Sequence, residues 1–255
     1  MLGAIAMLLL SACTGIMGGI YDDPTEQPKS VEGQLYIDAS NWTEWFYIDL
    51  KALTNPATQQ SAFEQVQQPY PIPFPASTAE VITDHSAISG QTGMYTYWYD
   101  VWGAGISVNE FRYFQSTESQ TAPSEWSFAV HRDNVRTNNG RAYETQLTNI
   151  DDFSMTRQQL EQLPFTSDAW TETDVWTDQS QMLSSIIGCQ GISINPVLSS
   201  WLRLDVPPMP PSFTHNNHVF VLRLSDGSFA ALQLANYLSP LGKKCCLTIK
   251  YRYPL

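Results

Sequence analysis

Apolar and polar positions alternate over several short stretches of the chain, which is typical of β-strands with one buried face. We predict strands at residues 35–37, 45–48 and 126–130, and a further strand within the aromatic run at residues 94–102. Aromatic and β-branched side chains favour strands because they pack well on a pleated surface. The pattern therefore predicts a mainly β structure from about residue 34 onward.

The last third of the chain carries the clearest pattern. Residues 218–224 and 229–234 are predicted strands, and the turn between them contains the pair Asp226-Gly227, a strong hairpin signal. A longer connection over residues 236–244 then leads to a final strand at 245–253. We expect an antiparallel meander that ends close to the C-terminus.

Helical signals are weak. Short helices are predicted at residues 60–68 and 156–163, the second ended by Pro164. Residues 69–75 alternate proline with apolar residues and favour an extended, polyproline-like backbone. With no internal repeat, we predict one all-β domain over residues 34–255, made of antiparallel β-sheets with few short helices.

The first residues form a targeting segment. Residues 1–10 are an apolar run followed by Leu10-Ser11-Ala12-Cys13, which resembles a lipobox, so that residues 1–13 would be a signal peptide and Cys13 would carry lipid. No Lys or Arg precedes the apolar run, unlike most such segments; an ordinary signal peptide is the alternative. Residues 14–33 are polar and predicted to be a flexible tether. We expect an outer-membrane or cell-surface protein, anchored by lipid or released.

The charge balance narrows the classes of function. Thirteen basic and 25 acidic residues give a net charge of −12, which excludes a phosphate-backbone partner and disfavours binding to anionic lipid. Membrane contact is therefore expected only through the anchor. We find no G-x-S-x-G, no H-E-x-x-H and no phosphate-binding glycine loop, and we predict that the protein is not an enzyme.

Three cysteines remain after Cys13, namely Cys189, Cys245 and Cys246. Cys245 and Cys246 are neighbours in a predicted strand, so their side chains should point to opposite faces, and at most one would reach Cys189. We expect buried free thiols that pack as small apolar residues.

Two ordered stretches resemble the HmuY family of haem-binding lipoproteins from anaerobic Gram-negative bacteria. The first runs from Trp126 through His131-Arg132 to the segment Val135-Arg136-Thr137-Asn138. The second covers residues 219–253, with its Asp-Gly hairpin, the pair Asn236-Tyr237 and the closing run Leu247-Thr248-Ile249-Lys250-Tyr251. Together with the lipobox, the resemblance spans most of the chain, but residues 41–124 carry no motif that we can relate to the family.

The resemblance implies an all-β fold likened to a hand, in which two finger-like loops hold one haem (iron protoporphyrin IX) between two axial ligands. These ligands are histidines in some members and methionines in others. It also implies non-catalytic capture of haem, from host haemoproteins, and delivery to a TonB-dependent outer-membrane transporter.

The candidate haem-iron ligands are Met182 and Met209. Met209 lies between two Pro pairs, which stiffen the backbone and leave little entropy to lose when a ligand binds. Met182 lies 209 − 182 = 27 positions earlier, in a stretch that we interpret as a loop or a short helical turn opened by Asp178. The alternative for both is ordinary packing in the core.

Thioether sulfur is a soft ligand that favours reduced iron. A Met/Met site should therefore prefer ferrous haem, and it should tolerate mild acid because a thioether has no proton to lose.

Other side chains have competing interpretations. His215 is an alternative ligand in place of Met209, whereas His131 is interpreted as structural and His85 as exposed in a polar loop. Three tryptophans are candidates for the walls of a haem pocket, namely Trp170, Trp176 and Trp201. The alternative for each is packing in the core.

Two other functions stay open at this point. A surface β domain that binds glycan or protein and does not bind haem is the main alternative, since residues 41–124 leave room for it. Binding of copper(I) through the same thioethers is a third.

Overall fold

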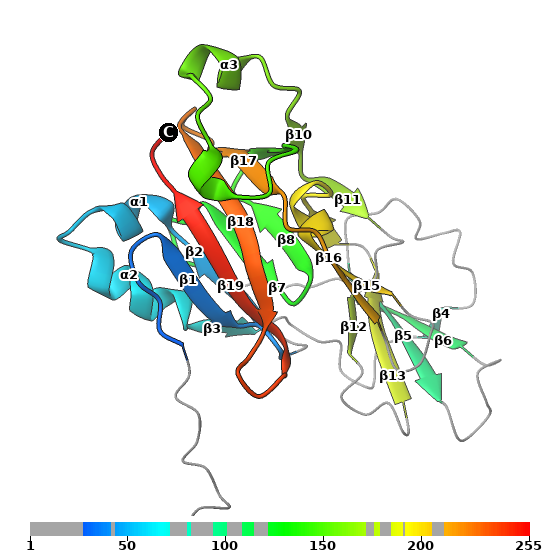
Figure 1. The fold of residues 1–255 in the computed structure, drawn as a ribbon. Coiled ribbons are helices and arrows are strands. Elements are labelled where there is room, and N and C mark those ends of the chain that lie inside the picture. Colours follow the sequence, from blue (N-terminus) through cyan, green and yellow to red (C-terminus); the bar gives the residue numbers. More distant parts are fainter. Residues whose placement is uncertain are drawn as a thin grey trace, which may run out of the picture.

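The computed structural model describes residues 28–41, 44–71, 81–82, 94–100, 109–114, 122–171, 176–178, 185–190, 192–205 and 212–255. These residues form mainly antiparallel β-sheets with few short helices, as predicted (Figure 1). Within the described residues, no helix is both long and apolar enough to cross a membrane. Cys13, His85, Met182 and Met209 lie outside the described residues.

The largest sheet has six strands in the order β1-β19-β18-β17-β9-β10. Its members are β1 (Gln34–Asp38), β9 (Arg141–Glu144), β10 (Thr166–Ser167), β17 (Val219–Arg223), β18 (Phe229–Leu238) and β19 (Lys244–Arg252). The run β17-β18-β19 is the predicted meander, and its first turn contains Gly227 with a positive φ of 84°. Glycine suits that conformation because it has no Cβ to clash.

Strand β18 continues beyond the predicted end at residue 234. Its register against β19 shifts between Leu234 and Asn236 and again between Asn236 and Leu238. The Asn236 side chain accepts hydrogen bonds from the backbone N–H groups of Tyr237 and Leu238. These irregularities break the alternation of apolar and polar residues, which is why the sequence pattern predicted a connection there.

A four-stranded sheet packs against one face of the six-stranded sheet. Its order is β3-β2-β7-β8, with β2 (Glu44–Ile48), β3 (Pro69–Pro71), β7 (Phe128–His131) and β8 (Asn134–Thr137). Alternate residues of β17, such as Phe220 and Leu222, meet Phe46, Ile48 and Phe128 in one core. Helices α1 (Leu50–Thr54) and α2 (Gln59–Val66) add Leu50, Leu53, Ala62 and Val66 to it.

The other face of the six-stranded sheet is covered by the segment from 147 to 165. This segment contains the 3-10 helix η2 (Ile150–Asp152) and helix α3 (Arg157–Glu161). Helix α3 begins with a capping box between Thr156 and Gln159, in agreement with the short helix predicted there. Val219 and Val221 of β17 point into this second core, so β17 is buried on both faces.

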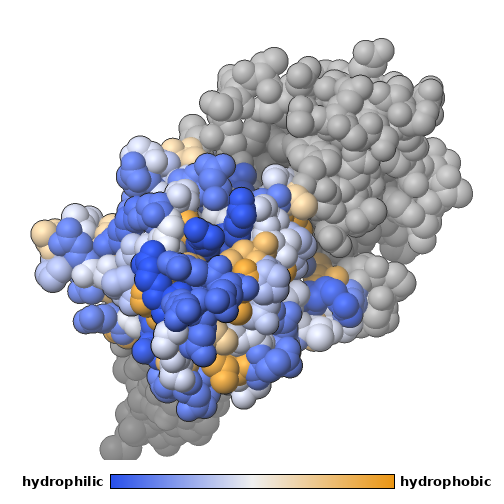
Figure 2. Space-filling model, turned by 90° about the horizontal axis from the view of Figure 1, so that it is seen from above, coloured by the Kyte–Doolittle hydropathy of each residue, from blue (hydrophilic) through white to orange (hydrophobic). Residues whose placement is uncertain are grey.

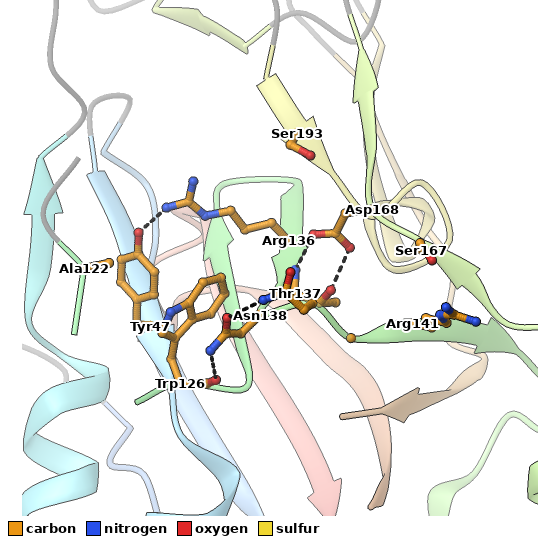
Figure 3. A pocket seen from close by; sticks show the side chains of 12 residues that line it. Tyr47, Ala122, Trp126, Arg136, Thr137, Asn138, Arg141, Ser167, Asp168 and Ser193 are labelled. Atoms are coloured by element: carbon orange, nitrogen blue, oxygen red, sulfur yellow. Dashed lines mark hydrogen bonds between the residues drawn. The ribbon is translucent and has the colours of Figure 1, made fainter. Parts of the chain in front are cut away.

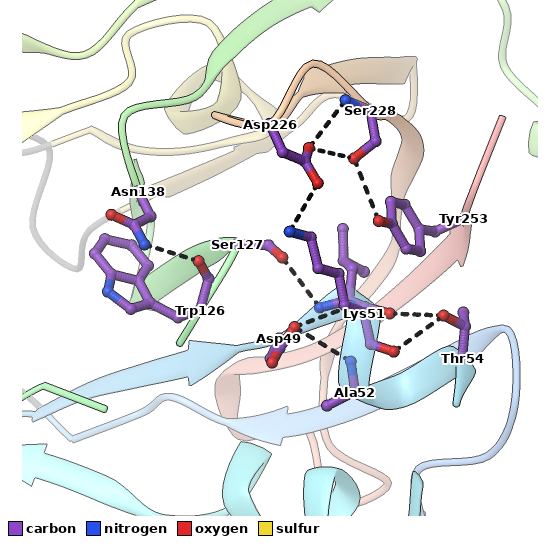
Figure 4. A network of polar contacts seen from close by, with 11 residues as sticks. Asp49, Lys51, Ala52, Thr54, Trp126, Ser127, Asn138, Asp226, Ser228 and Tyr253 are labelled. Carbon is purple, nitrogen blue, oxygen red and sulfur yellow. Dashed lines mark hydrogen bonds and ion pairs between the residues drawn. The ribbon is translucent and has the colours of Figure 1, made fainter. Parts of the chain in front are cut away.

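Helix α1 is tied to the hairpin turn of β17 and β18 by polar contacts (Figure 4). Asp49 caps the helix by accepting from the N–H groups of Lys51 and Ala52. The Lys51 ammonium lies 2.7 Å from the Asp226 carboxylate, and Asp226 also accepts from Ser228. Figure 2 shows the top of the molecule, where the described surface is largely hydrophilic, in keeping with the acidic composition.

Residues 30–33, which we expected in the tether, are part of the folded domain. The Ser30 hydroxyl accepts from Tyr36 N–H at 3.0 Å, and Gly33 O accepts from Tyr251 N–H at 2.9 Å. The domain therefore starts a few residues earlier than predicted, and the contact between Gly33 and Tyr251 joins positions that are far apart in the sequence.

A third sheet has five strands in the order β12-β13-β5-β6-β4. It lies to one side of the two packed sheets (Figure 1). Its strands are β4 (Val81–Ile82), β5 (Met94–Asp100), β6 (Asn109–Phe114), β12 (Trp176–Asp178) and β13 (Ser185–Gln190). Two further strand pairs, β11 (Ala169–Thr171) with β14 (Ile192–Ile194) and β15 (Leu202–Asp205) with β16 (Ser212–His215), complete the fold.

Candidate functional site

The strands on either side of Met182 form two antiparallel pairs in succession along the chain, here together called the first hairpin. Near its base β11 pairs with β14, with Ala169 opposite Ile194. Farther out β12 pairs with β13, with Asp178 opposite Ile187. Met182 belongs to the connection 179–184 between these two strands. Asp178 is the last residue of β12, and the helical turn that it was predicted to open would begin in residues 179–184, which lie outside the described part of the structure.

Met209 has a corresponding position in a second hairpin, formed by β15 and β16. Leu202 pairs with His215 at its base and Asp205 with Ser212 at its outer end, and Met209 belongs to the connection 206–211. Met182 follows Asp178 by 182 − 178 = 4 positions, and Met209 follows Asp205 by 209 − 205 = 4 positions. Each methionine therefore comes at the same point of a connection between paired strands.

The two hairpins share a short base. Residues 195–201 join β14 to β15, and they include the 3-10 helix η3 (Leu198–Trp201). Asn195 is fully buried, and its carbonyl oxygen Oδ1 accepts from the N–H groups of Val197 and Leu198. The Ser199 hydroxyl accepts from Val135 N–H at 3.0 Å, which fixes η3 to β8.

Trp201 is a core residue and not a pocket wall. Its side chain has 0% exposure and packs edge-on against Phe128 and Phe220, with ring centroids 6.5 and 6.4 Å apart. A ring with no exposed surface offers no face for a porphyrin, which corrects the pocket role considered for it. Trp170 and Trp176 lie on β11 and β12 of the first hairpin, and their side chains lie outside the described part of the structure.

The second hairpin is attached to the six-stranded sheet by aromatic contacts. Phe213 stacks on Tyr237 of β18, and the ring of His215 meets Tyr237 edge-on. His215 Nε2 lies 2.8 Å from Leu234 O, and a carbonyl oxygen can only accept, so Nε2 carries the proton. This hydrogen bond holds the base of the hairpin and leaves Nδ1 as the nitrogen through which His215 would act in its alternative role as an iron ligand.

The other described histidines have structural partners. His131 is fully buried and its Nδ1 lies 2.8 Å from Glu44 O, which confirms the structural interpretation. His218 Nδ1 lies 2.7 Å from Glu144 Oε1, and Asn216 donates to the same oxygen. His215 and His218 thus have different partners, and the described residues contain no group of three His, Cys, Asp or Glu side chains that could hold a metal ion.

A polar pocket of about 680 Å³ lies beside the base of the first hairpin (Figure 3). Its lining includes Tyr47 and Trp126 on one side and Asp168 and Ser193 on the other. The Arg136 guanidinium lies 4.2 Å from the ring centroid of Trp45 and donates to the Tyr47 hydroxyl. Burial lowers the pKa of Arg136, while the Tyr47 hydroxyl opposes that shift.

Sequence reasoning missed the residues that form the base of the hairpins. Asp168 and Asn195 were not singled out, since each is an isolated polar residue without a motif. The pair Asn195-Pro196 favours the start of a turn, and it was the one local signal for this base.

Comparison with known proteins agrees with the fold and the motifs. The model of the HmuY protein family matches residues 41–251, including the segment 41–124 that no motif had related to it. No curated protein matches the chain closely enough to count as a relative.

Three solved structures are similar over most of their length. A putative HmuY-like haem-binding protein from Bacteroides vulgatus is 26% identical, with 87% of this chain and 91% of that chain covered and a TM-score of 0.53. A putative lipoprotein from Bacteroides fragilis is 24% identical, with 90% and 94% covered and a TM-score of 0.53. The apo HmuY analogue from Tannerella forsythia is 17% identical, with 90% and 97% covered and a TM-score of 0.55. Because the family model covers most of the sequence, the chain belongs to the HmuY family.

Proposed function

We propose that this protein binds haem without catalysis and that Met182 and Met209 are the two axial ligands of the iron. The observation that carries the proposal is the corresponding position of the two methionines in two hairpins that share one base. Membership of the HmuY family and the similarity to a putative haem-binding protein support it. The proline pairs around Met209 would limit the entropy lost on binding.

The proposal also includes a cellular role for the protein. The protein would capture haem at the bacterial surface, held by a lipid on Cys13, and pass it to an outer-membrane transporter. Each transfer would be an exchange of iron ligands and would need no chemical step by the protein. Trp170 and Trp176 lie on strands of the first hairpin and are proposed as walls for the porphyrin.

The identity of the ligands is tested by titrating haem into the purified protein under reducing conditions and recording the visible spectrum. Wild type should show a protein-shifted Soret band. Met182→Ala and Met209→Ala should each weaken binding by at least about tenfold, and the double variant should lose the shifted band, because a lost ligand is worth 1.4 kcal/mol or more.

The matched control is Met155→Ala, since Met155 packs against the second core, the cluster that contains Leu160 and Val221, and does not lie in either hairpin connection. This control should keep the wild-type band position, and so should His215→Gln, which retains a side-chain donor for Leu234 O but no imidazole. A double methionine variant with an unchanged band would overturn the ligand assignment, and a wild type without a shifted band would overturn haem binding itself.

The soft thioether ligands also predict a preference for ferrous haem. Affinity measured for ferric and ferrous haem between about pH 5 and 8 should favour the ferrous form and change little with pH, since a thioether does not titrate in this range. A clear ferric preference would contradict a Met/Met site.

A further inference from the structure

We infer that the hydrogen bond between the buried Asn195 and the partly buried Asp168 is a positioning device, which sets how the two hairpins stand relative to one another. The inference rests on the proposed function, because it explains how two ligands from separate hairpins reach one iron. Asn195 Nδ2 donates to Asp168 Oδ1 at 3.0 Å and to Thr166 O at 3.0 Å.

The pair closes the base of the first hairpin. In the pairing of β11 with β14, Ala169 lies opposite Ile194, so Asp168 and Asn195 are the next residues on each side. Asp168 is fixed to the four-stranded sheet, because its Oδ2 accepts from Thr137 N–H at 2.7 Å and its Oδ1 from the Thr137 hydroxyl at 2.8 Å. Figure 3 shows Asp168 directed at Thr137 from the side of the hairpin.

Asn195 also starts the segment that leads to the second hairpin. Its Oδ1 accepts from Val197 N–H at 3.1 Å and Leu198 N–H at 3.0 Å, which turns the chain into η3. Its own N–H donates to Val135 O at 2.7 Å. The side chain and backbone N–H of one fully buried residue therefore contact the first hairpin, strand β8 and the start of the segment that ends at β15.

A change in the pair Asn195 and Asp168 should alter the positions of the two proposed ligands. Met182 is 182 − 169 = 13 positions from Ala169, so a small rotation at the base becomes a large displacement in the connection. A second ligand adds to affinity only when both can engage the iron at once, since the second contact is then intramolecular. A base held by a buried amide and a carboxylate keeps that geometry before haem arrives.

Asn195→Asp separates the two roles of the amide. The carboxylate still accepts from Val197 and Leu198, so the turn into η3 is kept, but it now faces Asp168 and Thr166 O with no donor. We expect haem dissociation to be at least about tenfold faster, with a visible spectrum that shows loss of one axial ligand. Raising the pH should increase the effect, because two close carboxylates share a proton at lower pH.

Asn195→Asp combined with Asp168→Asn should restore part of the wild-type rate. The amide introduced at position 168 can donate to the carboxylate at position 195, while its oxygen still accepts from Thr137 N–H. The matched control is Gln233→Glu, another change from amide to acid at a buried side chain. In the wild type Gln233 Nε2 donates to Thr148 O and Asn217 O. This control should lower thermal stability without changing the haem spectrum.

A measurement without haem keeps this inference separate from the proposed function. Spin labels on cysteines introduced at positions 182 and 209, with Cys13 and Cys189 replaced by serine, report the distance between the two connections. We expect a broader distance distribution with Asn195→Asp than without it, and the wild-type width with Gln233→Glu. An unchanged distance distribution in Asn195→Asp would overturn the inference. So would an unchanged rate of haem dissociation in Asn195→Asp if that variant is only less stable. Absence of haem binding by wild type would overturn only the proposed function.

Discussion

Phe213 and Tyr237 stack with ring centroids 5.7 Å apart and an interplanar angle of 19°. Phe213 belongs to the second hairpin and Tyr237 to β18, so this contact joins the hairpin to the six-stranded sheet. Lys244 adds a cation on the Phe213 ring, at 4.8 Å from its centroid. The second hairpin is thus held by aromatic packing, whereas the first is held by Asp168 and Asn195.

Removing that stack should loosen the second hairpin. We expect Phe213→Ala to speed haem dissociation several-fold and to lower the free energy of unfolding by about 1 to 2 kcal/mol, since an aromatic pair contributes about 0.5–1.5 kcal/mol beyond its buried area. Stopped-flow transfer of haem to an acceptor protein and urea unfolding measure the two effects. Tyr237→Phe keeps the ring and should leave both unchanged; an equal loss in both variants would show that the stack itself is unimportant.

His131 should make the protein sensitive to acid. Burial lowers the pKa of His131 to about 3, against an ordinary value near 6.5. Below pH 6.5 the unfolded chain binds a proton that the folded protein does not, so the free energy of unfolding falls as the pH falls, by up to about 1.4 kcal/mol per pH unit from this group.

Urea unfolding of wild type and His131→Gln between pH 7.5 and 4.5 tests this contribution. The variant should be less stable at pH 7.5, and its deficit should shrink as the pH falls, because glutamine does not titrate. A deficit that stays constant over this range would mean that His131 does not supply the acid sensitivity.

Arg136 and Tyr47 should be energetically coupled. The guanidinium lies over the rings of Trp45, Tyr47 and Trp126, at 4.2, 5.3 and 5.7 Å from their centroids, and it donates to the fully buried Tyr47. Arg136→Met should cost about 1–3 kcal/mol, since it removes the partner of a buried hydroxyl. In the double variant with Tyr47→Phe most of that cost should disappear, and a double-mutant cycle that gives additive losses would contradict the coupling.

The thiols of Cys245 and Cys246 should be inert in the folded protein. Both are free and have 0% exposure, and burial raises the pKa of Cys245 to about 12. The thiolate is the reactive species, so iodoacetamide at pH 8 should modify neither residue until denaturant is added. Mass spectrometry of the peptide that contains both residues measures the modification, and rapid labelling of the native protein would contradict their burial.

The sequence by itself determined the local elements of this fold. The meander at the C-terminus follows from strand-length apolar runs and an Asp-Gly turn, and helix α3 follows from Thr156 and Gln159, because all of these signals lie within a few neighbouring residues. Burial of Cys245 and Cys246 was also predictable, since both lie in an apolar strand, and His131 was expected to have a structural role. The family motifs added the two candidate methionines.

Only the tertiary structure decided how these elements combine. Trp201 is a core residue because its ring packs against Phe128 and Phe220. Phe128 precedes it by 201 − 128 = 73 positions, and Phe220 follows it by 220 − 201 = 19 positions. The pairing of Asp168 with Asn195, and of Phe213 with Tyr237, likewise joins residues that share no local pattern. Hydrogen bonds and ring contacts between distant positions leave no periodicity in the sequence, so the common base of the two hairpins appears only once the chain is folded.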